Sequence, residues 1–587
     1  MFDNTLKLTK FMLNREKVTS TAWVLSMVIL NFLILVLMGS VLMPDADAIK
    51  EFMTMLENPA LLAMVGPLYS MDVATMGALY TLMMFVFMGI AVAIMNIFLV
   101  VRHTRADEEA GRYEVLRSLP VGRLANVNAA MLTAVVVNVV MAVLFTVTMW
   151  LGMAIIGDPM GFNAALLWGV TLAAVGLSFA GIAALFSQLS SNSRGASGFS
   201  FMLMGLFYFL RAGADASPSD MGFLAFLSPF GISSRTWVYV NNVWWPVLVI
   251  LAFAAVFTAL AYKMCSIRDI DQGIIPARAG SAQGGFLLKS HFGLNFRLLR
   301  TSIIAWVVIL FVIGLSYSVV LDGMDEFVAG NPAYRQMILG PTGLFDEEAL
   351  AAMPTEEIVV QMNAVLGMAG LSVVQLFANM TGFFMAMMAM IPVLMFILKA
   401  KSEEKAIRTE LIVATSTCKV KYLLGFVVIA FSSAVLIQIA QAVGLYSVAR
   451  NTLANPSDLP LSFLIQSVLV YVPAMWIMGG ITVLLVGLFP RRVGLTVSFG
   501  SKEASFLLFP RFSGLIWAFY GFTFIVMMYG RMMPEIAWMA NITPLGWVPQ
   551  LPMDDISWPV LIVKAVLGIA LAAAGIIFYR RRDINAH

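Results

Sequence analysis

Charged residues are scarce in this sequence. Only 12% of its 587 residues are Asp, Glu, Lys or Arg, and 60% are hydrophobic. A soluble protein carries roughly twice that share of charge. A soluble fold of this length would leave much apolar surface in water, so the composition excludes an ordinary soluble protein and favours one that lipid surrounds.

Cysteine and histidine are scarce as well. The two cysteines, Cys265 and Cys418, are too few and too far apart for a disulfide framework or a structural zinc site. The three histidines, His103, His291 and His587, are scattered and show no metal-ligand spacing. We therefore expect neither a metal nor a cofactor in this chain.

Nucleotide-binding and catalytic motifs are also missing. The motif G-x-x-x-x-G-K-[ST] does not occur, and the Gly-Ser-Lys at 500–502 lacks the rest of it. There is no His-Glu-x-x-His, no nucleophile-elbow motif and no paired His/Asp cluster. The chain is therefore expected not to be an enzyme and to contain no catalytic residue. Any ATP and Mg²⁺ that drive its action would bind a separate protein.

What the sequence has instead is long apolar runs. A window of about 19 residues, suited to membrane spans, finds twelve of them. They lie near 21–43, 75–101, 124–157, 163–186, 198–211, 242–262, 302–321, 371–398, 422–448, 461–489, 512–530 and 557–579. The run 198–211 is short for a bilayer that needs about 20 helical residues. We predict an all-α polytopic membrane protein with about twelve transmembrane helices.

The positions of Lys and Arg predict the orientation. With the N-terminus inside and the loops assigned alternately, 29 of the 36 Lys and Arg residues fall on inside segments and six on outside segments. The remaining one, Lys564, lies within the last span. This positive-inside bias predicts a multi-pass protein of the cell membrane with both termini in the cytoplasm.

The first six runs resemble the last six. Arg105-Ala-Asp-Glu matches Lys401-Ser-Glu-Glu, Trp245-Pro-Val-Leu matches Trp558-Pro-Val-Leu, and further matches follow the same order. Six spans are an even number, so both halves enter the membrane in the same orientation, as in a parallel repeat. We predict two six-helix bundles, residues 1–280 and 281–587, with a pathway between them.

A compact charged segment follows the second span of each half. Arg105, Glu108 and Arg112 are spaced i, i+3 and i+7, which would place them on one helical face. A solvated helix with internal ion pairs would show the same pattern, but the repetition on the predicted cytoplasmic side suits docking to a two-fold symmetric partner. The candidate docking residues are Arg105, Asp107, Glu108, Arg112 and Glu114 in the first half and Lys401, Glu403, Glu404, Arg408 and Glu410 in the second.

The stretch from Arg102 to Arg123 carries a family resemblance. Its Arg-Ala-Asp-Glu-Glu-Ala-Gly-Arg-x-Glu, followed by Leu-Pro-Val-Gly-Arg, resembles permeases of the type 2 ABC exporters, particularly the duplicated polyketide antibiotic exporters. In that family the loop is the coupling helix that contacts the ATPase. The resemblance implies a homodimeric ATPase, two copies per permease, and export of hydrophobic or amphipathic compounds such as drugs or antibiotics. The second copy departs from the pattern at Lys405, Ile407 and 416–419, which would make the two docking sites unequal.

Two basic amphipathic segments, 5–18 and 286–300, precede the two halves. Each alternates apolar and basic residues at helical spacing, which is typical of a helix lying in the membrane interface. In the resembled family such a helix precedes each bundle. The interfacial residues predicted here are Lys7, Lys10, Phe11, Lys17, Lys289, Phe292, Arg297 and Arg300.

Two proline-broken apolar segments, 212–241 and 531–556, follow the fifth and eleventh spans. Non-helical backbone at membrane depth must be buried in protein or line a cavity. These segments are therefore either short re-entrant elements or ordinary external loops.

Two other functions compete with an exporter permease. A secondary transporter driven by an ion gradient usually needs acids within its spans, and only Lys564 is ionisable deep in a predicted span. A membrane-embedded enzyme would need catalytic acids or metal ligands, which the sequence lacks. We expect contacts with membrane lipid and a hydrophobic small molecule and none with nucleic acid; the sequence does not indicate the substrate-binding residues.

Overall fold

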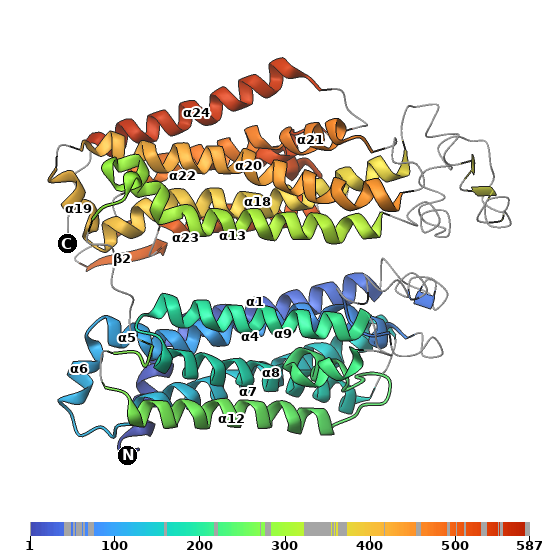
Figure 1. The fold of residues 1–587 in the computed structure, drawn as a ribbon, viewed down its shortest axis with the longest axis vertical. Helices are drawn as coiled ribbons and strands as arrows, with labels where there is room; N and C mark the ends of the chain where they lie inside the picture. Colours follow the sequence, from blue (N-terminus) through green and yellow to red (C-terminus); the bar gives the residue numbers. More distant parts are fainter. Residues whose placement is uncertain are drawn as a thin grey trace. The chain divides into compact units, whose positions relative to one another are not determined.

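We describe a computed structural model of the whole chain. The residues it describes are 2–39, 75–157, 161–216, 221–269, 272–275, 283–321, 372–415, 417–453, 459–489, 493–499, 502–509, 512–529, 537–549 and 556–581, with short pieces between 49 and 68 and between 354 and 361, and residue 551. The chain divides into two compact units, unit 1 (Met1–Gly280) and unit 2 (Ser281–His587). Both are built from long helices (Figure 1).

Unit 1 is a helical bundle around one central helix. Its long helices are α1 (Thr5–Leu37), α4 (Met76–His103), α7 (Ala125–Ile156), α8 (Phe162–Leu189), α9 (Ser193–Ala216) and α12 (Trp245–Ile267). Helix α8 is the most buried and packs against α4, α7, α9 and α12. Small residues allow this close approach: a Cβ on Gly181 would lie 2.9 Å from the carbonyl oxygen of Ala254 on α12.

Unit 2 repeats this order of helices. Its long helices are α13 (His291–Val320), α18 (Val373–Lys405), α20 (Lys419–Thr452), α21 (Leu461–Leu469) with α22 (Val472–Leu488), α23 (Phe512–Tyr529) and α24 (Trp558–Arg581). Helix α22 packs on α24, and a Cβ on Gly480 would collide with the carbonyl of Gly568. This contact corresponds to that of Gly181 with Ala254 in unit 1.

The helices confirm the predicted all-α membrane fold. Among the described residues, ten helices are long and apolar enough to cross a membrane by length and composition, the α21–α22 pair being one of them. The other two predicted spans, 198–211 and 512–530, correspond to α9 and α23, the fifth long helix of each unit. Helix α9 carries Arg194, Arg211 and Asp215 and is not one of these ten, and α23 counts only as a shorter apolar helix, over Ser513–Met527.

The proline-broken segments form short helical turns. In unit 1 these are η2 (Gly222–Leu227) and α11 (Pro229–Ser234), and in unit 2 η7 (Ala537–Ile542) and η8 (Pro544–Trp547). Ser228 Oγ accepts the amide N–H of Gly231, and Thr543 Oγ1 accepts that of Gly546 at the equivalent place. All six residues of α11 are buried. In unit 1, therefore, α11 is part of the packed bundle, whereas Phe223, Phe226 and Leu227 of η2 are exposed.

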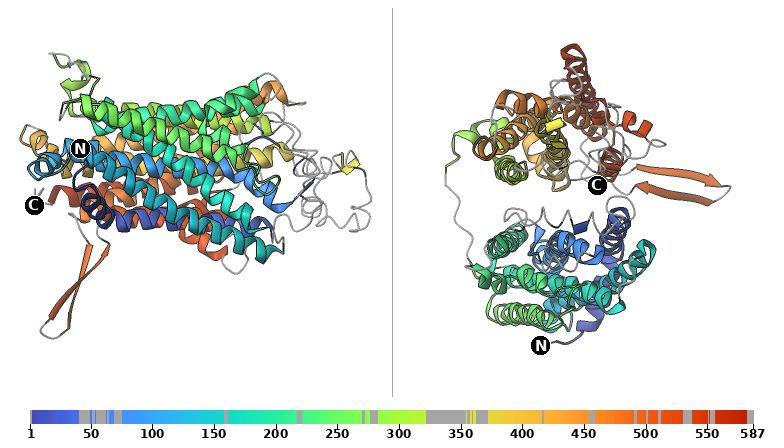
Figure 2. Two further views of the ribbon diagram at one scale, coloured as in Figure 1. Left: turned by 90° about the horizontal axis from the view of Figure 1, so that it is seen from below. Right: turned by 90° about the vertical axis from the view of Figure 1, so that its right-hand side faces the viewer.

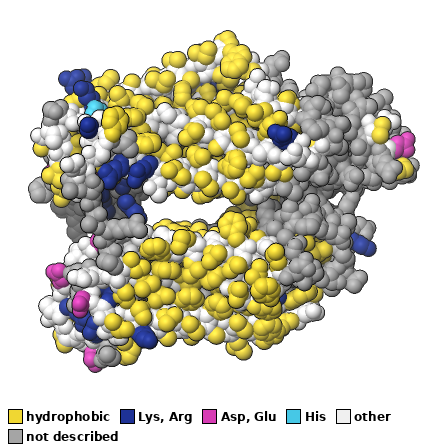
Figure 3. Space-filling view, in the orientation of Figure 1, with side chains coloured by type: hydrophobic (Ala, Val, Ile, Leu, Met, Phe, Trp, Pro, Cys, Tyr) yellow, Lys and Arg dark blue, Asp and Glu magenta, His cyan; other side chains and the backbone are white. Residues whose placement is uncertain are grey.

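Two features mark the ends of the units. In unit 1, segments near residues 2–20, 102–123, 187–193 and 268–275 meet at one end, where the Asn4 amide donates to the carbonyl of Pro120 (2.7 Å). On the face drawn in Figure 3, hydrophobic side chains cover the middle of each unit, and most of the visible Lys and Arg of each unit lie toward one of its own ends. A two-stranded antiparallel hairpin, β1 (Val493–Phe499) and β2 (Lys502–Phe509), projects from unit 2 (Figure 2).

Candidate functional site: the charged elbows

We call residues 102–123 the first elbow and residues 399–421 the second elbow. The first contains two short helices, α5 (Arg105–Glu109) and α6 (Arg112–Arg117), separated by Gly111, whose φ is 71°. The predicted single helical face is therefore wrong. The chain turns at Gly111, so Arg112 does not continue the face of Arg105 and Glu108.

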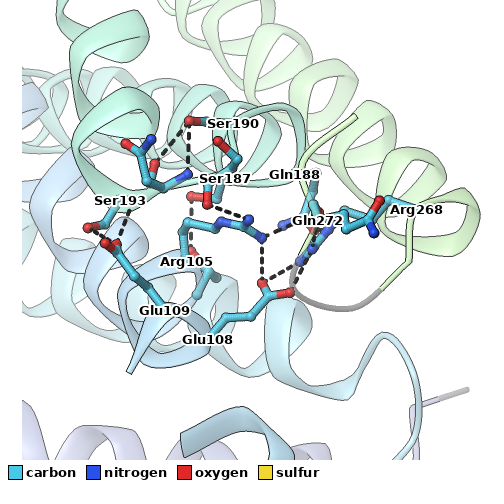
Figure 4. Close-up of polar contacts among 12 residues, drawn as sticks. Arg105, Glu108, Glu109, Ser187, Gln188, Ser190, Ser193, Arg268 and Gln272 are labelled. Atoms are coloured by element: carbon cyan, nitrogen blue, oxygen red, sulfur yellow. Dashed lines mark hydrogen bonds and ion pairs between the residues drawn. The ribbon is translucent and has the colours of Figure 1, made fainter. Parts of the chain in front are cut away.

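Glu108 is buried at the base of the first elbow. Its carboxylate accepts hydrogen bonds from both terminal nitrogens of Arg268 (2.7 and 2.6 Å) and forms an ion pair with Arg105 at 3.0 Å. Figure 4 shows both guanidinium groups converging on this carboxylate. Only 5% of Glu108 is exposed. Burial alone would lower the pKa of Arg268, but the hydrogen bond and charge of Glu108 outweigh it and raise that pKa above its ordinary value.

Arg105 ties the elbow to α8 and to the segment after α12. It donates to the carbonyl of Ser191 (2.7 Å) and, at 3.5 Å, to that of Gln272. Beside it, Glu109 accepts the amide and hydroxyl of Ser193 at the start of α9 (2.9 and 2.5 Å). The acids of α5 therefore fasten the elbow onto its own bundle.

Asp107 joins the elbow to α1. It accepts two hydrogen bonds from Arg15 (2.6 and 2.9 Å) and one from Arg112 (2.9 Å). The neighbouring Glu16 of α1 lies 2.9 Å from Arg102 and 3.2 Å from the buried ring of His103. Arg15 lies 92 positions before Asp107, so sequence spacing could not reveal this contact.

The second elbow repeats the arrangement. Lys401 pairs with Glu404 (3.2 Å) at the end of α18, and Arg408 donates to Glu403 (2.6 Å) from α19 (Arg408–Val413). Lys399 adds a third contact to Glu403 (2.7 Å). The pairs Lys401–Glu404 and Arg408–Glu403 lie 296 positions after Arg105–Glu108 and Arg112–Asp107, so the two elbows share these two ion pairs.

The turn between the two short helices also repeats, although its residue does not. Ile407 stands where the first elbow has Gly111, and its φ is 62°. The left-handed region is rarely used by β-branched side chains. The second elbow therefore keeps the left-handed backbone conformation of the turn although isoleucine replaces glycine there.

The side chains that the elbows expose differ from those predicted. Arg105, Asp107, Glu108 and Glu403 are buried, Lys401, Glu404 and Glu410 are half-buried, and Arg112, Glu114 and Arg408 are exposed. Sequence reasoning missed two exposed apolar residues, Val115 (68%) and Leu411 (73%), which are also 296 positions apart. The signal in the sequence was an apolar residue at the same position of two otherwise charged segments.

The predicted interfacial residues are all exposed, but their segments are not separate helices. Helix α1 runs without a break from Thr5 to Leu37 and includes the first segment. Leu8 and Met12 pack on the start of α7, while Phe11 faces outward. The second segment enters α13 after the turn η3 (Phe286–Lys289). The exposed residues are Lys7, Lys10, Phe11, Lys17, Lys289, Phe292, Arg297 and Arg300.

A second charged cluster lies near the opposite end of unit 1. Asp215 of α9 is fully buried, 2.8 Å from Arg235 and 3.4 Å from Arg211. Arg211 and Arg235 are two of the six Lys and Arg residues that the predicted orientation places outside, and Asp215 was not predicted from the sequence. The i, i+4 spacing of Arg211 and Asp215 at the end of an apolar run was the available signal. The cluster joins α9 to the end of α11.

Comparison with known proteins identifies relatives of the whole chain. A family described as "Multidrug efflux system permease Rv1217c, C-terminal domain" matches residues 11–264, 288–366, 342–500 and 495–580. The chain is 27% identical, over all 587 residues and 96% of the relative, to the multidrug efflux system permease protein Rv1217c of Mycobacterium tuberculosis. That relative is named as a permease, which is a transporter and not an enzyme. The chain belongs to the family of this multidrug efflux system permease.

Proposed function

We propose that this chain is the membrane-spanning permease of an ABC exporter that removes hydrophobic or amphipathic compounds, such as drugs or antibiotics, from the cell. Membership in the permease family and the membrane fold support a transporter that exports drugs. We infer the export of antibiotics and the coupling to ATP hydrolysis from the resemblance of the first elbow to the coupling helix of type 2 ABC exporters.

The observation that carries the proposal is the repetition of the elbow. Each copy pairs its first acid, Asp107 or Glu403, with an exposed arginine, turns through a left-handed residue and exposes an apolar side chain at the same position, Val115 or Leu411. Two corresponding, though unequal, surfaces on one chain suit a partner with two identical subunits. We propose a homodimeric ATPase, with two copies per permease, that binds ATP and Mg²⁺, and we place both elbows and both termini in the cytoplasm.

The test substitutes the exposed apolar residues. Surface substitutions usually change stability by no more than about 0.5 kcal/mol, so Val115→Asp and Leu411→Asp should leave expression and thermal unfolding unchanged. A charge placed at the centre of a docked surface should reduce ATPase co-purification at least tenfold, since central interface residues contribute about 2 kcal/mol or more. The readouts are pull-down of the co-expressed P-loop ATPase and drug-stimulated ATP hydrolysis in proteoliposomes.

Ile275→Asp is the matched control, because Ile275 is an exposed apolar residue at the same end of unit 1 but outside the elbow. Full ATPase binding by both elbow variants would refute docking at these surfaces. Transport by the chain alone under an imposed ion gradient, without ATP, would instead support the alternative of a secondary transporter.

A further inference from the structure

A groove of about 370 Å³ runs between α1 and α7 in unit 1. One wall is α1 from Leu13 to Leu25, and the other is the face of α7 that carries Val136, Val137, Val140 and Leu144. The two helices are parallel, since Leu8 and Met12 pack near the start of α7 and Leu35 packs at Gly152 near its end. Position along the groove therefore corresponds to the same depth on both walls.

The groove changes from polar to apolar along its length. On the α1 wall, the end nearer the elbow carries the polar residues Asn14, Lys17, Ser20 and Thr21 beside Leu13. Leu25 lies eight residues beyond Lys17, which is about 12 Å along a helix. There the groove is apolar, lined by Leu25 on α1 and by Val140 and Leu144 on α7. Val139 and Val143, which do not line the groove, are exposed beside it on α7, so this lining continues into the apolar surface of the bundle.

The charge at the polar end is positive. Glu16 also lines the groove, but its carboxylate is already held by Arg102 at 2.9 Å. Lys17 is exposed there, and Lys7 and Lys10 precede it on the same helix. An ammonium with amide and hydroxyl groups beside it suits a phosphate group, and an apolar channel at membrane depth suits an acyl chain.

We propose that this groove is a binding site for one anionic phospholipid, with its phosphate at Lys17 and an acyl chain between α1 and α7. Anionic lipids concentrate in the cytoplasmic leaflet, which is where the distribution of Lys and Arg predicts this end of unit 1 to lie. The inference uses only residues of unit 1 and does not depend on an ATPase partner.

The experiment counts lipids that remain bound to the purified full-length permease. Native mass spectrometry is run in detergent with equal amounts of phosphatidylglycerol and phosphatidylcholine. We expect one phosphatidylglycerol to be retained per chain in preference to phosphatidylcholine. Val140→Trp, which fills the groove, should abolish this binding. Lys17→Gln should lower the preference for phosphatidylglycerol about fivefold, the effect of one basic residue near an anionic surface.

Two controls separate the groove from general changes of the surface. Val139→Trp places the same bulk on the next residue of α7, which is equally exposed but does not line the groove. Lys10→Gln removes an exposed charge of α1 outside it. Both should keep the bound lipid. Unchanged retention in Val140→Trp, or equal retention of the two lipids by the parent, would overturn the proposal.

Discussion

The ion pairs of Glu108 make a quantitative prediction for the stability of the first elbow. Glu108→Gln keeps the shape of the side chain but removes the negative charge between Arg105 and Arg268. Removing one partner of a buried ion pair costs about 3–5 kcal/mol. Arg105 would keep the carbonyl of Ser191 and Arg268 the side-chain oxygen of Gln188, so we expect the lower end, about 3 kcal/mol.

A loss of this size should appear as local opening of the elbow. About 3 kcal/mol raises the population of the open elbow roughly 150-fold. Limited trypsin digestion at Arg112 and Arg117 follows that population when cleavage is slow relative to closing. Glu108→Gln should therefore be cut far faster than the parent, while α1 and α8 stay intact.

Glu114→Gln provides the matched control, because Glu114 lies on the same elbow but is exposed. Its digestion rate should stay within about threefold of the parental rate, as expected for a surface change below about 0.5 kcal/mol. Equal digestion of Glu108→Gln and Glu114→Gln would refute the assignment of Glu108 as the acid that fastens the elbow.

Two further predictions concern the second elbow. Ile407→Gly should stabilise the second elbow by about 1 kcal/mol, because the strain of a left-handed residue, about 1–3 kcal/mol, exceeds the cost of the extra backbone entropy that glycine has in the unfolded chain. Gly111→Ile should destabilise the first elbow for the converse reason. Thermal unfolding at the same temperature for both variants and the parent would contradict this argument. Cys418 is exposed on the second elbow, whereas Cys265 is buried. A membrane-impermeant maleimide should therefore label Cys418 in inverted membrane vesicles but not in intact cells, and the Cys418→Ser variant should not be labelled in either. Labelling of the parent in intact cells would show that the proposed orientation is wrong.

The sequence predicted the features that depend on neighbouring residues. Runs of apolar residues located the long helices, and the Arg-Ala-Asp-Glu match located both elbows. These signals are local, because a membrane helix satisfies its own backbone hydrogen bonds. The two proline-broken segments could not be resolved in this way, since burial of α11 depends on helices from distant parts of the chain.

The prediction that Arg105, Glu108 and Arg112 share one helical face was wrong for the same reason. Their spacing suggested one exposed face that could dock a partner. The partner of Glu108 is Arg268, 160 positions away, and that of Asp107 is Arg15. Helical periodicity describes one helix in isolation, so it could not show that these acids face the bundle and that Val115 faces outward.

The continuity of α1 has a mechanical consequence. Its 33 residues form a rod about 50 Å long, and Arg15 fastens the rod to Asp107 roughly a third of the way along it. A tilt of the first elbow would therefore swing the far end of α1 through a larger arc than the elbow itself. In the second elbow the described partners of Glu403, Lys399 and Arg408, belong to the elbow itself. Among the described contacts, Glu403 therefore does not connect the second elbow to the first helix of its bundle. Equal displacements of the two elbows would then move the two bundles by different amounts.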